Sequence, residues 1–581
     1  MKRLLKGSLA IASAAVIFAG NMPFTAVNVL ADSNETEVIP SIDNTVYTGT
    51  WGTCNWTYDN GILTISGGVA QGSKSWDSYK NNIEKVVITG KITFDKETSL
   101  YGLFSKMTSL KTMEGLSNLD TSRVTDMDSM FRDCSSLETL DVSGFDTSRV
   151  TNMSGMFYGC NALTTLDVSH FDTSKVTRMG SMFHGCSSLE TLDVSGFNTS
   201  NVESMDGMFY ECRKLQNIDV SKFDTGKVKS MDFMFSYCEG VKIIDVSNFN
   251  TENVTRMGCM FQFASQCEVL DVKNFNTSRV IDMGGMFSGC KSITYLDVSN
   301  FDTSKVTDMR AMFQNIQCEE LDLKNFDTSK VTNMNSMFGN DTKLKKVDVS
   351  SFDTSKVTDM RYMFGNTKSL KELDVSSFNT SNVTDMSNMF YLCYKLYNLD
   401  ISGFDMSKVT KMTEMFKGAS LVTIKVPAKL AEDKDAFLQE MKSGMRSGKW
   451  IDETAGVNYD NAASVELGEG HSYRFNPVKM YAILNMTNTT EGKELTARVK
   501  GGAPDYTYKF IMYNPSADKW TLLSDYSSSR SYILNMKGNG ERKIYVDVKD
   551  ALGNVVRTSK TITLTGQEPL TVEASKNETD K

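Results

Sequence analysis

Hydrophobic and polar positions recur along most of the chain with a fixed period. The phrase Leu-Asp-Val-Ser, with conservative replacements, is spaced by 26 residues except for one step of 25. Its copies begin at Leu140, Leu166, Leu192, Ile218, Ile244, Leu270, Leu296, Leu321, Val347, Leu373 and Leu399. A second phrase, V-x-x-M-x-x-M-F, runs in phase with it in twelve copies, from Val124 to Val409. A period in the range of roughly 20–29 residues with this leucine spacing indicates a solenoid of leucine-rich-repeat type.

Each repeat predicts its own local structure. Residues 137–143 alternate apolar and polar, which predicts a short strand with Leu140 and Val142 facing inward. Residues 146–148 have the composition of a turn or a helix cap. The next apolar residues are three or four positions apart, which predicts one or two helical turns: Val150, Met153, Met156 and Phe157. The expected fold class is therefore an α/β solenoid with one short strand and one short helical turn per coil.

The pattern divides the chain into six segments. A single coil cannot offset the backbone entropy of its own ordering, about 1–2 kcal/mol per residue, so the coils must stack and both ends need caps. We expect a solenoid of about twelve coils over residues 111–426, preceded by a β-rich cap over 32–110 and followed by a cap over 427–476. Short β-rich runs separated by Gly, Asn and Asp turns predict an immunoglobulin-like sandwich over 477–566. Residues 567–581 are polar and are expected to be disordered.

The first 31 residues predict a signal peptide. Lys2, Arg3 and Lys6 precede an uncharged apolar run over residues 9–19, and Ala31 ends a small-residue cleavage site. The alternative is a membrane anchor, but the run is short for a bilayer span. We therefore expect a secreted, extracellular protein that does not insert into a membrane after the signal is removed. Association with the cell surface stays open.

The repeated motifs resemble those of a known family. The phrases Leu-Asp-Val-Ser, Phe-Asp-Thr-Ser-Lys-Val-Thr and Met-Phe-x-x-Cys are similar to those of BspA-like leucine-rich-repeat surface proteins, and residues 49–54 look like an N-terminal segment of its Gram-positive members. The region around Tyr506, Tyr508, Tyr526 and Tyr532 resembles triple-tyrosine, immunoglobulin-like modules. The resemblance implies surface display and adhesion to components of host or bacterial surfaces. The chain lacks the LPxTG-type sorting signal of wall-anchored members, which leaves covalent attachment in doubt.

Charge and sulfur content narrow the possible partners. A formal net charge of −9 argues against nucleic acid, because phosphate binding requires a basic surface. Of the 35 Met residues, 24 occupy the two Met positions of the repeat, which favours core packing over a soft-metal site. Seven Cys recur at one repeat position and are interpreted as buried free thiols, with stacked disulfides as the alternative: Cys134, Cys160, Cys186, Cys212, Cys238, Cys290 and Cys393. No cofactor is expected.

An uninterrupted row of Asp follows the first residue of every Leu-Asp-Val-Ser phrase. Like charges one strand apart repel, so the row must have partners. Three interpretations remain: hydrogen bonding within each coil, an exposed stripe that faces a ligand, or a calcium site on Asp245, Asp271 and Asp297. We favour the first of these.

Catalytic chemistry is not indicated. His170, His184 and His471 occupy variable or cap positions with no Ser, Cys or carboxylate singled out beside them. The chain has no P-loop, dinucleotide-binding or zinc-protease motif. We therefore expect a binding protein and not an enzyme.

The predicted function is adhesion through the extended repeat surface, with a protein or glycan as partner. Variable residues that are candidates for this surface are Arg178, His184 and Tyr210. The alternative is a structural stalk whose C-terminal sandwich recognises a glycan or cell wall. The oligomeric state is left open.

Overall fold

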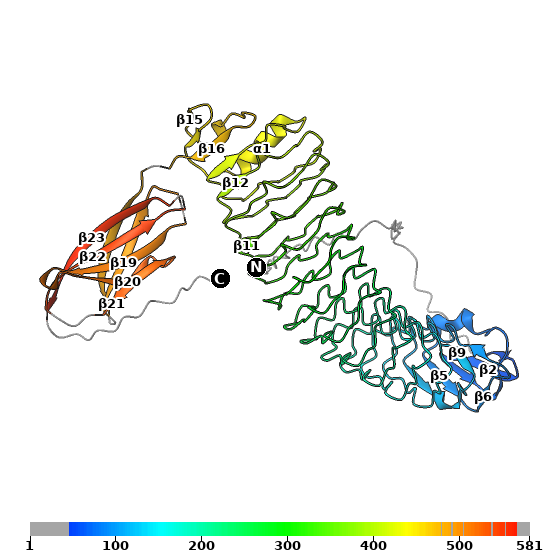
Figure 1. Ribbon diagram of the computed structural model, residues 1–581. Coiled ribbons are helices and arrows are strands. Elements are labelled where there is room, and N and C mark those ends of the chain that lie inside the picture. Colours follow the sequence, from blue (N-terminus) through cyan, green and yellow to red (C-terminus); the bar gives the residue numbers. More distant parts are fainter. Residues whose placement is uncertain are drawn as a thin grey trace, which may run out of the picture. The chain divides into compact units, whose positions relative to one another are not determined.

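The computed structural model describes residues 46–477, 479–489, 492–503, 505–535, 539–551 and 553–565. The predicted signal peptide (1–31) and the predicted disordered tail (567–581) lie outside the described residues. Figure 1 shows a row of stacked coils between the N-terminal strands and a small C-terminal cap, and a separate group of longer C-terminal strands. None of the helices among the described residues is long and apolar enough to cross a membrane.

The N-terminal segment is a β-meander that turns into the first coils. Its strands are β1 (Tyr47–Trp51), β2 (Cys54–Asp59), β3 (Ile62–Ile65), β4 (Gly68–Val69), β5 (Lys85–Ile88), β6 (Ile92–Thr93), β7 (Thr98–Ser99), β8 (Thr112–Glu114) and β9 (Val124–Asp126), with short 3₁₀ helices at Asp77–Asn82 and Leu116–Asn118. The first three pair antiparallel, whereas β3, β5 and β8 run parallel. Coil stacking therefore begins before the first Leu-Asp-Val-Ser phrase.

The repeat forms a β-solenoid of about 15 turns, more than the twelve expected because flanking segments add turns. The Leu-Asp-Val-Ser segments lie side by side in one row, which we call the strand face. Its regular strands are short: β10 (Glu320–Leu321), β11 (Lys346–Val347), β12 (Asn398–Asp400) and β13 (Thr423–Lys425). Neighbouring coils pair in parallel along this row. Leu140 and Val142 are buried, which confirms their predicted inward orientation.

The predicted helical turn is wrong, and the leucine-rich-repeat type that depends on it is not supported. No α-helix is present among residues 111–426, all of which the structure describes. The V-x-x-M-x-x-M-F segments form a run of tight turns, which we call the turn face. In one coil, the N–H groups of Met153, Gly155, Phe157 and Gly159 donate to carbonyls of the next coil over 2.7–3.0 Å. The N–H groups of Met156 and Tyr158, which lie between them, donate to the carbonyls three residues back.

Left-handed backbone explains why this segment is not helical. In all twelve copies, two residues have positive φ: the one before the second Met and the second one after the Phe. In one coil these are Gly155 (57°) and Gly159 (72°). An α-helix cannot continue through such residues, and alternate N–H groups turn outward toward the neighbouring coil. The spacing of Val150, Met153, Met156 and Phe157 is thus shared by a helix and by a series of three-residue turns.

The core of the solenoid consists of side-chain ladders, each with one member per coil. Phe side chains of the turn face stack from Phe104 to Phe416 with ring centroids 5.5–6.0 Å apart. A buried Thr ladder fastens one coil to the next, since Thr147 Oγ1 donates to the carbonyl of Asp172 (3.1 Å) and Thr173 Oγ1 to that of Asn198 (2.9 Å). Stability therefore resides in the coil interfaces.

The Cys ladder lies in this core as free thiols. Cys160 Sγ donates to the carbonyl of Phe131 (3.3 Å) and Cys290 Sγ to that of Phe261 (3.1 Å). Burial raises the pKa of Cys186 to about 12, so the reactive thiolate is suppressed. We expect native protein to react with a thiol reagent at few of the ladder positions and to become fully reactive on unfolding. A mass measurement that found two or more ladder disulfides would contradict this.

The C-terminal cap closes the stack with one helix and a sheet. Helix α1 (Lys434–Gly444) lies within the segment expected to be a cap, and the Asp433 carboxylate caps its N-terminus by accepting from the Ala436 N–H. Strands β14 (Trp450–Asp452), β15 (Val457–Tyr459) and β16 (Ser472–Phe475) continue the sheet of β12 and β13, and a 3₁₀ helix spans Ala462–Ser464. Phe437 and Trp450 are buried at this end.

The C-terminal segment forms two antiparallel sheets. One has the order β17 (Tyr481–Thr489), β18 (Gly492–Lys500), β21 (Ser531–Leu534), and the other β20 (Lys519–Ser527), β19 (Thr507–Asn514), β22 (Asn539–Lys549), β23 (Val555–Thr565); a 3₁₀ helix spans Pro515–Ala517. Both sheets contribute to one core, with Leu495 and Tyr532 from the first and Phe510 and Val546 from the second. The expected β-rich module is thus present, and its immunoglobulin-like type stays a prediction.

Candidate binding surface

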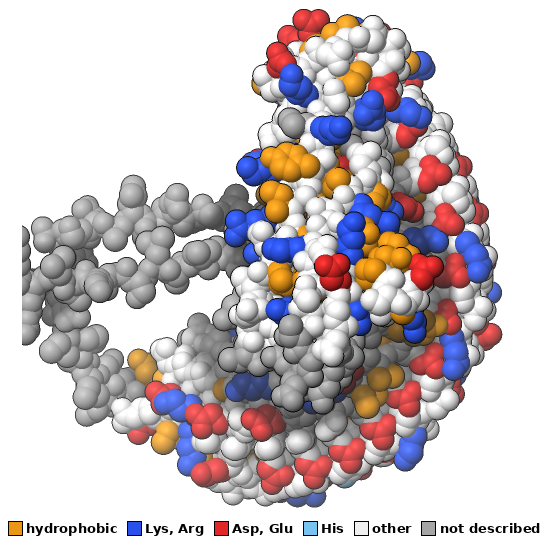
Figure 2. Space-filling view, turned by 90° about the vertical axis from the view of Figure 1, so that its left-hand side faces the viewer, with side chains coloured by type: hydrophobic (Ala, Val, Ile, Leu, Met, Phe, Trp, Pro, Cys, Tyr) orange, Lys and Arg blue, Asp and Glu red, His pale blue; other side chains and the backbone are white. Residues whose placement is uncertain are grey.

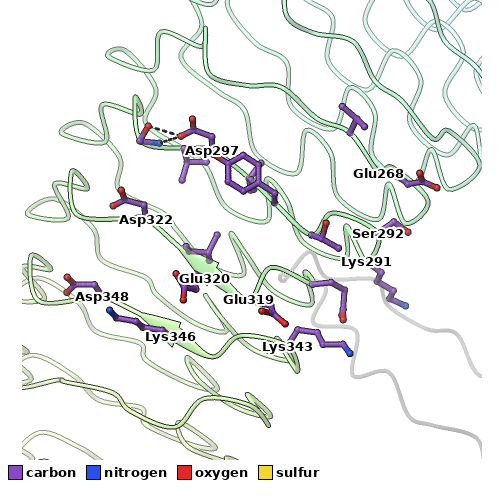
Figure 3. Close-up of a pocket in the computed structure, with 18 residues that line it drawn as sticks. Glu268, Lys291, Ser292, Asp297, Glu319, Glu320, Asp322, Lys343, Lys346 and Asp348 are labelled. Atoms are coloured by element: carbon purple, nitrogen blue, oxygen red, sulfur yellow. Dashed lines mark hydrogen bonds between the residues drawn. The ribbon is translucent and has the colours of Figure 1, made fainter. Parts of the chain in front are cut away.

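A groove of about 1570 Å³ lies on the strand face. It is lined by Glu268, Val269, Lys291, Ser292, Thr294, Tyr295, Leu296, Asp297, Val298, Ser299, Gln317, Glu319, Glu320, Leu321, Asp322, Lys343, Lys346 and Asp348. Figure 3 shows Asp297, Asp322 and Asp348 following one another from coil to coil on one side, with Lys291 and Lys343 on the other. Glu268 and Glu319 lie on the same side as these Lys residues, and Lys346 lies beside Asp348, so the groove presents charges of both signs.

Three exposed apolar side chains form a stripe beside this groove. Ile243, Val269 and Tyr295 occupy one repeat position in consecutive coils, and their exposed fractions are 60%, 56% and 77%. We call them the apolar stripe. The other coils carry polar residues at this position: Thr139, Thr165, Thr191, Asn217, Glu320, Lys346, Glu372 and Asn398. Exposed apolar side chains that adjoin one another mark interaction surfaces more often than isolated ones do.

The Asp row next to the stripe is hydrogen-bonded within its own coils. In all eleven copies, the carboxylate accepts from the backbone N–H two residues later, which closes an Asx turn. In most copies a Ser hydroxyl or Lys ammonium adds a second bond, as for Asp245 with Ser247 Oγ (2.6 Å) and Asp297 with Ser299 Oγ (2.7 Å). Asp271 instead pairs with Lys273 over 2.9 Å. Figure 2 shows acidic side chains recurring from coil to coil.

These bonds favour the ionised form of Asp271 and Asp297. The hydroxyl and N–H of Ser299 lower the pKa of Asp297, and the side chain and N–H of Lys273 lower that of Asp271. A carboxyl whose pKa is lowered in the folded state stabilises the fold at pH values above its pKa in the unfolded chain. This contribution is lost as the pH falls through the pKa of the folded state. Asp271 and Asp297 are therefore charged at neutral pH.

Metal binding finds no geometric support here. Within the described residues, no group of three or more His, Cys, Asp or Glu side chains is arranged to hold a metal ion. Asp245, Asp271 and Asp297, the candidate calcium ligands, do not form such a group. Calcium requires six to eight oxygen ligands, whereas each of these carboxylates is engaged in its own turn.

Matched substitutions at Asp245, Asp271 and Asp297 test this interpretation. Asn keeps the acceptor of the Asx turn, so the triple Asn variant should unfold within roughly 0.5 kcal/mol of the parent. Ala removes the acceptor, and the triple Ala variant should lose about 1 kcal/mol per site. A chelator should leave the Tm of all three proteins unchanged. A chelator-dependent Tm that disappears in the Asn variant would establish a calcium site.

The predicted binding residues on the turn face are only partly brought together. The His184 ring lies between Tyr158 (4.1 Å between centroids) and Tyr210 (4.4 Å) in a half-buried aromatic row. Burial lowers the pKa of His184 and raises that of Tyr210 to about 12. Arg178 is exposed and pairs through its backbone with Asn152 and Ser204 of the neighbouring coils. Among the described residues, no hydrogen bond or ring contact joins it to His184 or Tyr210.

One expectation about histidine is corrected. His471 does have a carboxylate beside it, because its Nδ1 lies 2.7 Å from Asp452 Oδ2. Asp452 is buried and also accepts from the N–H groups of Thr454 and Ala455, so it holds the turn after β14. The described residues place no hydroxyl or thiol in hydrogen-bond contact with the His471 ring, and the pair has the contacts of a structural element of the cap.

The apolar stripe was missed by sequence reasoning although a signal for it exists. Aligning the repeats on Leu-Asp-Val-Ser shows three consecutive apolar residues at a position that is otherwise polar. The strand alternation that correctly placed Leu140 inward also places this preceding residue outward. What the sequence could not show is that these coils border a groove.

Comparison with known proteins identifies the repeat. No curated protein and no solved structure matches the chain. A family model described as "Mycoplasma protein of unknown function, DUF285" matches in overlapping segments, at residues 78–165, 98–218, 138–244, 179–293, 240–318 and 314–428. These segments together cover residues 78–428, more than half of the 581 residues. The chain therefore belongs to this DUF285 repeat family.

Proposed function

We propose that the chain is a secreted or cell-surface binding protein, without catalytic activity, that adheres to components of host or bacterial surfaces through its strand face. The partner is a protein or a glycan. This function is compatible with an extended repeat solenoid and with the BspA-like character of the repeats, which we retain as part of the proposal. The predicted signal peptide over residues 1–31 supports export.

The apolar stripe carries the proposal. Tyr295 is 77% exposed and adjoins a groove, and Tyr is among the residues that contribute most to binding energy at interfaces. Charged side chains of both signs flank it, with Asp297 and Asp322 on one side and Lys291, Lys343 and Glu319 on the other. An apolar centre between charged borders has the general layout of a protein-binding surface.

Substitution of the stripe tests the proposal. In the full chain, Ile243→Thr, Val269→Thr and Tyr295→Thr together introduce the residue that earlier coils carry at this position. Because all three side chains are exposed, the variant should fold normally. Its binding to immobilised host-matrix proteins and bacterial surface extracts should fall at least about tenfold, the equivalent of roughly 1.4 kcal/mol.

A matched control uses the same repeat position. Thr139→Asn, Thr165→Asn and Thr191→Asn change three consecutive coils to a residue that occurs naturally at Asn217. This variant should bind as the parent does. Equal binding by the parent and a well-folded stripe variant would show that the strand face is not the adhesive surface.

A further inference from the structure

The C-terminal sheets expose a cluster of aromatic rings. In the sheet β20-β19-β22-β23, Trp520 lies opposite Tyr513, and Leu522 and Tyr545 lie on either side of Ile511. The side chains that alternate with these, Met512, Ile544 and Val546, are buried in the core between the sheets. Trp520, Tyr513 and Tyr545 therefore share the outer face of this sheet.

The rings lie close together on that face. The centroid of Trp520 is 4.7 Å from that of Tyr513 and 5.1 Å from that of Tyr545. Trp520 is 51% exposed and Leu522 is 54% exposed, whereas Trp51, Trp56, Trp76 and Trp450 are at most 5% exposed. Trp520 is thus the single exposed Trp among the five of the chain. An open cluster of this kind marks a contact surface.

Polar groups hold the rings and border them. Lys543 Nζ lies 5.4 Å from the centre of the Tyr545 ring, and the Arg557 guanidinium lies 5.6 Å from it. Arg557 also pairs with the buried Asp547, and the Tyr513 hydroxyl donates to Asp518 (2.9 Å). The Lys509 ammonium pairs with Asp525 over 3.4 Å. Two of these three cations, Arg557 and Lys509, are therefore compensated by carboxylates, whereas Lys543 contacts the Tyr545 ring.

We propose that this face is a binding site for an uncharged polysaccharide. The apolar C–H faces of pyranose rings would pack on Trp520 and Tyr545, and sugar hydroxyls would hydrogen-bond to Lys543, Arg557 and the Tyr513 hydroxyl. The pairing of Arg557 and Lys509 with carboxylates favours a neutral chain over a polyanion, because a polyanion gains from a cluster of uncompensated cations. The site goes beyond the strand-face function and stands or falls independently of it.

Trp520 provides its own probe. In the full-length protein, acrylamide should quench the fluorescence of Trp520, and the Trp520→Phe variant should lose this accessible component. Soluble β-glucan, galactomannan and chitin-derived oligosaccharides serve as neutral ligands, with dextran sulfate as the polyanion. At least one neutral ligand should protect Trp520 and retard the protein in affinity electrophoresis, with at least tenfold weaker retardation for Trp520→Ala and for Tyr545→Ala.

Controls separate the outcomes. Tyr481→Ala removes an aromatic ring that is 47% exposed on β17 of the other sheet and should leave retardation unchanged. Equal binding of dextran sulfate and the neutral ligands would indicate non-specific ion exchange and overturn the proposal. So would a Trp520 that is inaccessible to acrylamide in the free protein, absence of protection by every neutral ligand, or loss of protein-partner binding alone in Trp520→Ala. If substitution of the apolar stripe did not reduce partner binding, the results expected for Trp520 would be unaffected.

Discussion

Replacement of Phe287 by Ala is expected to lower the free energy of unfolding of its region by about 3–5 kcal/mol. Phe287 is fully buried and stacks between Phe261 (5.9 Å between centroids) and Phe313 (6.0 Å). Its removal leaves a cavity at two coil interfaces at once, and these interfaces are where the stability of the solenoid resides. Replacement of the buried neighbour Met286 by Ala should lower the free energy of unfolding by about 2–5 kcal/mol.

Hydrogen exchange measures this effect locally. Amide protection should fall in the coils around Phe287 and persist in distant coils, because each coil contacts only its neighbours. Tyr295→Ala is the matched control, since this aromatic side chain is 77% exposed and its loss should change stability by no more than roughly 0.5 kcal/mol. Unchanged protection near Phe287 would mean that the stacked Phe ladder is not the core.

Asp341 should make its coil less stable as pH rises. It occupies the Cys-ladder position and is fully buried, and Oδ1 accepts from the Ile316 N–H (2.9 Å) while Oδ2 has no partner among the described residues. Burial raises the pKa of Asp341 well above its usual value. The folded state then retains a proton that the unfolded chain releases. Stability is thus fully present below the unfolded pKa and falls with rising pH by up to about 1.4 kcal/mol per unit until the folded pKa is passed.

Asp341→Asn tests the direction of this effect. The amide keeps an acceptor for the Ile316 N–H and cannot ionise, so the variant should exceed the parent in stability at about pH 8 and match it near pH 4. Chemical unfolding at both pH values gives the difference. Asp348→Asn is the control, because hydrogen bonds from Ser350 lower the pKa of this exposed residue and its small effect should have the opposite sign. A stability difference for Asp341→Asn that is independent of pH would refute the buried-carboxyl interpretation.

The sequence predicted the solenoid because its period and its strand alternation are direct consequences of stacking. Leu140 and Val142 face inward as expected, and the Cys ladder is buried. The prediction of a helical turn was wrong for Val150, Met153, Met156 and Phe157, because their spacing fits both a helix and a run of turns. Gly155, Gly159 and Asn340 lie at left-handed positions, and the recurrence of such residues at these two sites was the available warning.

The candidate sites were predicted less completely, for reasons that differ between them. The structural role of the Asp row followed from its constancy and agrees with its Asx turns. His184 and Tyr210 were selected because they vary, and they lie together, but variation alone could not show that their rings are packed against each other. The Trp520 cluster depends on cross-strand neighbours far apart in the chain, which composition and periodicity do not contain.

Site-specific photo-crosslinking tests the central claim most directly, namely that the strand face binds the partner. A benzophenone amino acid in place of Tyr295 puts the reactive group in the apolar stripe, and one in place of Tyr101, which is 67% exposed outside the groove, provides the control. After incubation with host-matrix proteins and bacterial surface extracts, the account predicts a crosslinked partner from position 295 and none from position 101. Equal crosslinking from both positions, or crosslinking from position 101 alone, would contradict it.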